Sequence, residues 1–168
     1  MIKIHKPQFK FLLNKEFFSV SLAIKKPQWC FGIKNKIIDD MYIPFFDFDD
    51  TLLSEVEVFS DNLYELNERK CGYSILQSSD YNYHVIFWKL VSYHTYLHYL
   101  VYALKHGMDK GYLQAFLSRG FSILRISPKG NKKMPKLVKY QAGQDDDLII
   151  AALLRGNKQL IVYTTFNY

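Results

Sequence analysis

The order of strand-like and helix-like segments between Pro44 and Ser127 limits this chain to a small number of folds. IPFFDFD is rich in aromatic residues and indicates a strand that ends at Asp49. A helix follows, because apolar residues recur at spacings of three and four at Val56, Phe59, Leu63 and Leu66. GYSILQSS and YHVIFWKLV then indicate two strands, and the turn residues SDYN between them predict a hairpin.

Two helices and a strand complete this order. Helical spacing of apolar residues begins at Ser92 and stops near Gly107, a short second helix covers 113–117, and FSILRIS indicates a fourth strand. The resulting order of β, α, β, β, α, β predicts an α+β fold of the ferredoxin-like or RRM-like type, with a split βαβ sheet. In that fold the helices cover one face of the sheet, the other face is open to a ligand, and the first and third strands are neighbours.

The length and the apolar content predict a single domain spanning 1–168. The chain has 168 residues, of which 49% are hydrophobic, so it can bury a substantial core. The expected core covers 44–129, with an N-terminal extension at 1–43 and a basic loop, a helix and a strand at 130–168. Because FLL near the N-terminus is too short for a signal peptide and no apolar run approaches about 20 residues, we expect an intracellular, cytoplasmic protein without membrane contact.

The positive charges gather in one part of the chain. The formal net charge is +6, and no acidic residue occurs between Asp109 and Asp145. The basic residues of this interval are Lys110, Arg119, Arg125, Lys129, Lys132, Lys133, Lys136 and Lys139. Such segregation favours a surface for a polyanion such as nucleic acid, to which Lys132, Lys133, Lys136 and Lys139 would bind; a solvated basic loop is the alternative.

The segment FFDFDDTLL places several carboxylates at the end of the first strand. Side chains alternate along a strand, so Asp47 and Asp49 share one face and are candidate ligands of a divalent cation. Ser78 and His84 bracket the hairpin turn, and the pairing of the first and third strands would bring His84 toward the carboxylates. The alternative is that these acids serve only to form a turn and to cap the following helix, although Thr51 or Ser54 can also provide that cap.

These motifs resemble the catalytic core of the archaeo-eukaryotic primase and primase-polymerase superfamily. FFDFD is similar to its D-x-D motif, and SSDYNYHVIF is similar to its serine-to-histidine motif, although Asn82 or Tyr83 stands where that turn usually has glycine. The resemblance covers roughly 44–129. It implies a metal-dependent nucleotidyltransferase, a DNA primase or polymerase of the kind found in a small mobile element or virus, acting on a DNA or RNA template with nucleoside triphosphates and in contact with other replication proteins.

The same resemblance implies roles for individual residues. Asp47 and Asp49 would bind Mg²⁺ or Mn²⁺, and His84 would be a catalytic and nucleotide-binding residue together with Ser78. Arg125 and Lys129 would bind the nucleotide or stabilise charge on the transferred phosphoryl group.

The superfamily pattern also includes a third carboxylate on a later strand. The expected strand, FSILRIS, carries Arg125 instead. The run Asp145 to Asp147 could supply the missing acid, but these residues also fit the acidic first turn of a helix. A chain without the third carboxylate would be a degenerate enzyme.

Two other functions fit parts of the sequence. DFDDTL also resembles the first motif of the haloacid-dehalogenase superfamily of phosphohydrolases, with Asp47 as nucleophile, Asp49 as general acid and base, and Ser78, Lys129 and the GQDDD acids as further motifs. That fold needs parallel strands separated by helices, whereas the second motif here runs into a hairpin. The third candidate is a non-catalytic module that keeps the fold and the basic residues and binds single-stranded nucleic acid. In the polymerase interpretation, template bases could also stack on exposed members of Tyr81, Tyr83 and Trp88.

Overall fold

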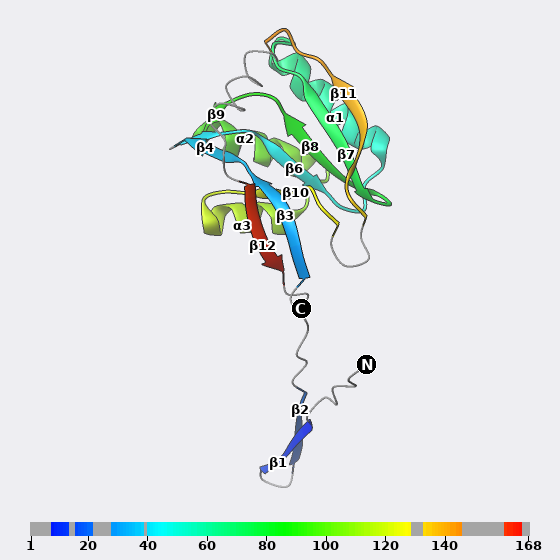
Figure 1. Ribbon diagram of the computed structural model, residues 1–168, viewed down its shortest axis with the longest axis vertical. Helices are drawn as coiled ribbons and strands as arrows, with labels where there is room; N and C mark the ends of the chain where they lie inside the picture. The colour runs from blue at the N-terminus through cyan, green and yellow to red at the C-terminus, as the bar shows by residue number, and fades with distance from the viewer. Residues whose placement is uncertain are drawn as a thin grey trace.

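The computed structural model describes residues 8–13, 16–21, 28–38, 40–128, 133–145 and 160–165 (Figure 1). Its helices are α1 (Leu53–Leu66), α2 (Tyr93–Lys105) and α3 (Lys110–Arg119). Its strands are β1 (Gln8–Leu13), β2 (Glu16–Ser21), β3 (Gln28–Lys34), β4 (Lys36–Ile38), β5 (Met41–Tyr42), β6 (Phe45–Phe48), β7 (Tyr73–Ser79), β8 (Asn82–Phe87), β9 (Val91–Ser92), β10 (Ile123–Arg125), β11 (Lys136–Gln141) and β12 (Leu160–Thr165).

The main sheet has the strand order β11-β7-β8-β6, and each neighbouring pair is antiparallel. Helix α1 joins β6 to β7, and β8 lies between these two strands. This arrangement confirms the predicted hairpin of β7 and β8, and it confirms the predicted pairing of the first strand with the third. The α+β class is therefore confirmed.

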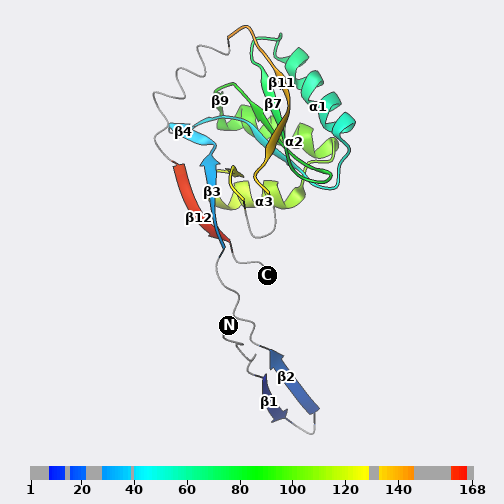
Figure 2. The ribbon, with the colours of Figure 1, turned by 45° about the vertical axis from the view of Figure 1, so that its right-hand side comes forward.

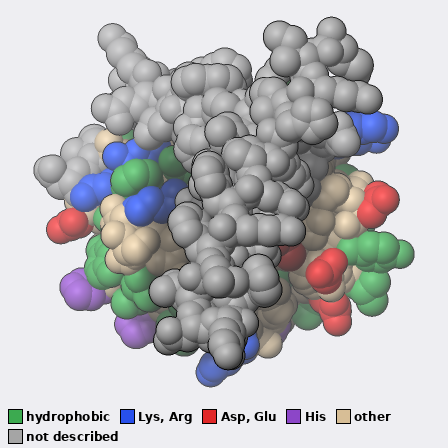
Figure 3. All heavy atoms as spheres, turned by 90° about the horizontal axis from the view of Figure 1, so that it is seen from below, with side chains coloured by type: hydrophobic (Ala, Val, Ile, Leu, Met, Phe, Trp, Pro, Cys, Tyr) green, Lys and Arg blue, Asp and Glu red, His purple; other side chains and the backbone are tan. Residues whose placement is uncertain are grey.

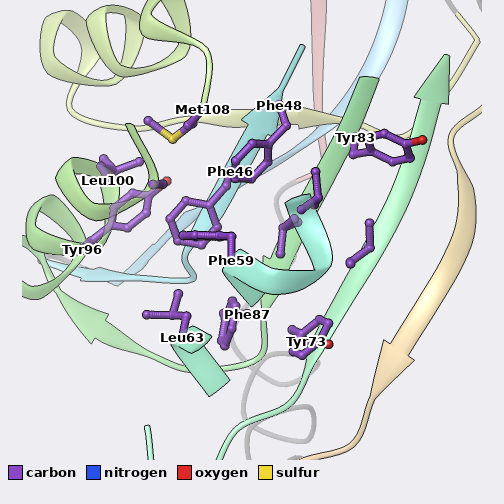
Figure 4. Close-up of a cluster of buried hydrophobic side chains, with 14 of the residues drawn as sticks. Phe46, Phe48, Phe59, Leu63, Tyr73, Tyr83, Phe87, Tyr96, Leu100 and Met108 are labelled. Atoms are coloured by element: carbon purple, nitrogen blue, oxygen red, sulfur yellow. The ribbon is translucent and has the colours of Figure 1, made fainter. Parts of the chain in front are cut away.

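Helices α1 and α2 lie against one face of the main sheet (Figures 1 and 2). Phe46 and Phe48 of β6 point into this layer, where the ring of Phe59 lies 5.1 Å from each of theirs (Figure 4). Tyr83 and Phe87 of β8 are buried in the same cluster. Because side chains alternate along a strand, Asp47 and His84 point to the opposite face.

A second layer covers part of that opposite face. Strand β3 pairs with β10 on one side and β12 on the other, so the N-terminal extension and the C-terminal strand share a sheet. Leu124 of β10 packs with Phe45 and Ile86 of the main sheet, and Ile33 of β3 lies against the same cluster. The second face is therefore only partly open to a ligand, because apolar side chains on both sheets bury each other there.

The predicted fourth strand exists as β10, but it does not join the main sheet. The outer edge of β6 is occupied by other groups: the Tyr96 hydroxyl accepts a hydrogen bond from the Phe45 amide (3.3 Å) and donates one to the Phe45 carbonyl (2.7 Å). The Asp109 amide donates to the Asp47 carbonyl (2.8 Å). Since these groups satisfy the edge of β6, β10 pairs with β3 instead.

The start of α1 also differs from the prediction. The N-cap residue is Leu52, and the Glu55 carboxylate accepts a hydrogen bond from its amide (3.1 Å), so neither Thr51 nor Ser54 caps the helix. The Thr51 hydroxyl instead donates to the Asp49 carbonyl (3.0 Å). Thr51 therefore stabilises the loop that carries the carboxylates.

Candidate active site

The loop that follows β6 is fixed to the tip of the β7-β8 hairpin. The Asp50 amide donates to the Asn82 side-chain oxygen (3.0 Å), and the Thr51 amide donates to the Tyr81 carbonyl (2.9 Å). Asp50 has a φ of 51°, in the left-handed region, which turns the chain from the strand toward α1. These contacts hold Asp49 near the end of β6.

A third carboxylate, from Asp109, joins Asp47 and Asp49. Each of the three residues places one carboxylate oxygen within 4.8 Å of the others, and Asp47 and Asp109 are half-buried. Asp109 is the N-cap of α3, where its side chain accepts hydrogen bonds from the amides of Gly111 (3.0 Å) and Tyr112 (2.9 Å). The helix and the bond to the Asp47 carbonyl therefore both position this carboxylate.

The position of this third acid corrects the sequence-based expectation. It lies in the loop between α2 and α3, whereas we expected it on the FSILRIS strand or among Asp145 to Asp147. The Asp145 amide donates to the Lys70 carbonyl (2.7 Å), just before β7 begins, which is the opposite end of the main sheet from Asp47. Asp146 and Asp147 lie outside the described residues.

The donor set of this acidic cluster fits a hard divalent cation. Mg²⁺ and Mn²⁺ prefer oxygen ligands, and Mg²⁺ is usually held by one or two carboxylates while it keeps several waters. Three carboxylates this close repel one another, and a cation between them would offset that repulsion. Asp47, Asp49 and Asp109 are thus the described residues that could hold a metal ion.

His84 lies beside this cluster, as predicted from strand pairing. It stands directly opposite Asp47 in the β6-β8 ladder, and its Nε2 is 3.4 Å from Asp47 Oδ1. The imidazole is almost completely buried, which restricts its orientation. The structure therefore brings Asp47, Asp49 and His84 together.

Ser78 and Arg125 lie together, one strand further from the carboxylates. Ser78 is buried at the end of β7, and its hydroxyl is 3.4 Å from the Asn82 carbonyl. The Arg125 guanidinium donates to the carbonyls of Ser127 (2.6 Å) and Lys133 (3.0 Å) and lies 3.5 Å from that of Ser78. Through these contacts Arg125 holds Ser127 and Lys133, at the two ends of the basic loop, close to the end of β7.

The predicted nucleic-acid-binding lysines fall into different environments. Lys133 and Lys136 are exposed, and Lys136 lies opposite Gln77 near the hairpin tip. Lys139 instead forms ion pairs with Asp61 (3.2 Å) and Glu57 (3.7 Å) on α1. Lys129 and Lys132 lie outside the described residues. Where Figure 3 shows described side chains, most Lys and Arg gather on its left and most Asp and Glu on its right.

A cleft of about 640 Å³ adjoins the acidic cluster through Asp49. The walls come from the start of α1 and the end of α2, and the lining residues are Asp49, Asp50, Thr51, Ser54, Glu55, Val58, Lys105, His106 and Gly107. The His106 ring packs 4.6 Å from that of Tyr102, which holds it at the cleft wall. Mixed charge and a short apolar patch make this cleft suitable for a polar organic ligand.

The sequence interpretation missed Asp109, Lys105 and His106. One signal for Asp109 was available, because an aspartate directly before a helical segment is a favoured N-cap. No local pattern indicated that this cap would meet the carboxylates of β6, or that the end of α2 would face the start of α1.

Comparison of the chain with protein-family models, curated proteins and solved structures gives no significant match. In the part of the chain that the structure describes, no helix combines the length and the apolar character needed to span a bilayer.

Proposed function

We propose that this protein is a metal-dependent nucleotidyltransferase that acts on a nucleic-acid template, of the primase-polymerase type. The observation that carries the proposal is the cluster of Asp47, Asp49 and Asp109, whose oxygens lie within 4.8 Å of one another. The split βαβ order of β6, α1, β7 and β8 agrees with the RRM-like core that the resemblance implies. Asp109 can supply the third carboxylate that the resemblance implies, which supports an active enzyme over a degenerate one.

The carboxylates of the acidic cluster and His84 would have different roles in phosphoryl transfer. A Mg²⁺ or Mn²⁺ ion at the cluster would neutralise triphosphate charge and lower the pKa of a primer 3′-hydroxyl. Asp47 and Asp109 are held rigidly, by the β6-β8 ladder and by the N-terminus of α3, so their oxygens are pre-organised for such an ion. The buried His84 imidazole lies next to Asp47, with Nε2 3.4 Å from Asp47 Oδ1, and can orient that carboxylate toward the ion.

The neighbouring cleft supports a nucleotide as substrate. Its volume of about 640 Å³ falls within the usual range of about 300 to 1,000 Å³ for small-molecule sites. Lys105 and His106 on its wall can bind phosphate oxygens, and Val58 offers an apolar contact for a base or sugar. Because Asp49 belongs to both the cleft and the cluster, a nucleotide in the cleft would reach the metal-binding carboxylates.

The haloacid-dehalogenase interpretation has less support. That superfamily requires a parallel sheet, whereas every strand pair among the described residues is antiparallel. Ser78, its second motif, is buried against its own hairpin.

The test is incorporation of labelled nucleotides on single-stranded DNA, with and without a primer, in Mg²⁺, in Mn²⁺ and in chelator. We expect metal-dependent incorporation by the wild type that is lost in Asp47→Asn, Asp49→Asn and Asp109→Asn. Asp145→Asn is the matched control, because it removes an exposed carboxylate at the opposite end of the sheet.

Other outcomes would contradict the proposal. Salt-sensitive DNA binding without incorporation would indicate a non-catalytic module, and metal-dependent phosphatase activity lost in Asp47→Asn would indicate the phosphohydrolase. Loss of incorporation in Asp145→Asn but not in Asp109→Asn would place the third ligand elsewhere.

A further inference from the structure

Tyr81 occupies an unusual position at the tip of the β7-β8 hairpin. Its φ is 59°, in the left-handed region that disfavours residues with a large side chain, and 59% of the residue is exposed to solvent. Burial of the ring therefore does not compensate for the strained backbone. Strain of this kind persists where the surrounding structure imposes it, and it clusters at ligand-binding sites.

The neighbouring asparagine has a local role in the turn, whereas the tyrosine does not. Asparagine tolerates the left-handed region better, and Asn82 is the next residue. Its side chain is already used, because it accepts from the Asp50 amide (3.0 Å) and donates to the Ser79 hydroxyl (2.6 Å). The conformation of the turn does not require an aromatic side chain at position 81.

The hairpin tip lies between the acidic cluster and the basic start of β11. On one side the Tyr81 carbonyl accepts from the Thr51 amide (2.9 Å), within the loop that carries Asp49. On the other side Lys136 pairs with Gln77, and Arg125 links Ser78 to the Lys133 carbonyl. A strand whose phosphates contact Lys133 and Lys136 would therefore pass the Tyr81 ring on its way to the carboxylates.

Of the three aromatic residues that could stack on a base, Tyr81, Tyr83 and Trp88, only Tyr81 is exposed to solvent. Tyr83 is 6% exposed and belongs to the core. Trp88 is half-buried, and its indole N–H donates to the Ser74 hydroxyl (2.9 Å). Among the described residues, none makes a hydrogen bond or a ring contact with the Tyr81 side chain.

We infer that Tyr81 is a stacking platform for a base of the single-stranded template next to the acidic cluster. The identity of this ligand rests on the proposed function. Stacking on an aromatic ring tolerates any base, which suits an enzyme that must accept every template sequence. The strained turn presents the ring to solvent beside the loop that carries Asp49, where a base could reach it.

The test is binding of a fluorescently labelled single-stranded DNA 20-mer, measured by anisotropy over a series of salt concentrations. We expect Tyr81→Ala to weaken binding by about five-fold or more, which corresponds to the lower end of measured base-stacking effects. Tyr81→Phe should keep the affinity of the wild type. The slope of log affinity against log salt should not change in Tyr81→Ala, because no phosphate contact is lost.

Two further variants separate stacking from disturbance of the fold. Tyr140→Ala removes a tyrosine of similar exposure (50%) from β11, opposite Ser74 and far from the hairpin tip, and should bind DNA as the wild type does. Tyr81→Gly relieves the left-handed strain, so it should melt at a higher temperature than the wild type and still bind DNA weakly. A more stable protein that binds less well cannot be explained by misfolding.

Equal affinity of Tyr81→Ala and Tyr140→Ala would overturn the inference, as would a wild type that does not bind single-stranded DNA. The DNA-binding result tests the stacking role of Tyr81, and the incorporation assay separately tests the proposed enzyme activity. Incorporation with no effect of Tyr81 would leave the proposed function standing without this platform, whereas Tyr81-dependent binding without incorporation would leave the platform and remove the enzyme.

Discussion

Replacing Asp109 with asparagine should leave the metal-free protein at least as stable as the wild type while removing its stabilisation by metal. Asparagine is about as good an N-cap as aspartate, so α3 keeps its cap. The loss of charge at the helix N-terminus costs about 0.3 to 1 kcal/mol. Against this, the substitution removes repulsion between Asp109 and the other two carboxylates.

The size of that repulsion follows from the separation of the charges. Two unit charges 4.8 Å apart repel by about 1 kcal/mol at the dielectric constant of water and by about 3 kcal/mol at an effective value of 20. Asp49 is exposed, so the lower value applies to its pair with Asp109. Asp47 is half-buried, so its pair with Asp109 lies between the two values; with the cost at the helix terminus subtracted, the metal-free variant should gain about 1 to 3 kcal/mol, or roughly 2 to 4 °C in melting temperature for each kcal/mol.

Metal should reverse the order of stability. Binding at 100 times Kd stabilises a folded protein by about 2.7 kcal/mol, which the wild type would gain and Asp109→Asn would largely lose. The assay is thermal unfolding followed by circular dichroism, with chelator and with Mn²⁺. Asp109→Ala is the control, because it also loses the cap and should be less stable than Asp109→Asn by about 1 kcal/mol in chelator. Equal Mn²⁺ shifts in the wild type and in Asp109→Asn would refute the reasoning.

Two further substitutions test the packing around the site. Tyr96→Phe leaves the Phe45 amide and carbonyl without their buried partner and should cost about 1 to 3 kcal/mol in urea unfolding; an unchanged midpoint would contradict this account. Burial raises the pKa of Tyr96 to about 12, so its contribution to stability is complete below about pH 10, is lost as the pH rises through 12, and should be missing from the alkaline unfolding profile of Tyr96→Phe. Gly143→Ala would place its Cβ 2.3 Å from the Gly72 amide nitrogen and should cost roughly 3 kcal/mol. In the control Gly120→Ala, no atom of the described residues lies within 4 Å of the added Cβ, so this variant should lose only about 1 kcal/mol from its φ of 71°. Equal losses in the two variants would disprove the clash.

Part of the site could be predicted because it depends on neighbours in sequence or on simple strand pairing. The alternation of FFDFD places Phe46 and Phe48 in the core and Asp47 on the opposite face. The hairpin brings His84 opposite Asp47 once the first and third strands pair. The predicted short helix at 113–117 proved longer, Lys110–Arg119, because apolar periodicity detects its buried face and not the turn that Asp109 caps.

The sequence by itself determined the main helices and strands between Pro44 and Ser127, the two faces of β6 and the hairpin, since hydrophobic periodicity and turn chemistry are local properties. Only the tertiary structure decided that Asp109 completes the acidic cluster, because its position depends on how α2 and α3 pack and on one hydrogen bond to the Asp47 carbonyl. It also decided that β10 pairs with β3, because the Tyr96 hydroxyl and the Asp109 amide occupy the free edge of β6. Residues that are distant in sequence compete to hydrogen-bond the same amides and carbonyls at the edge of β6. The outcome of that competition leaves no periodic pattern in the sequence.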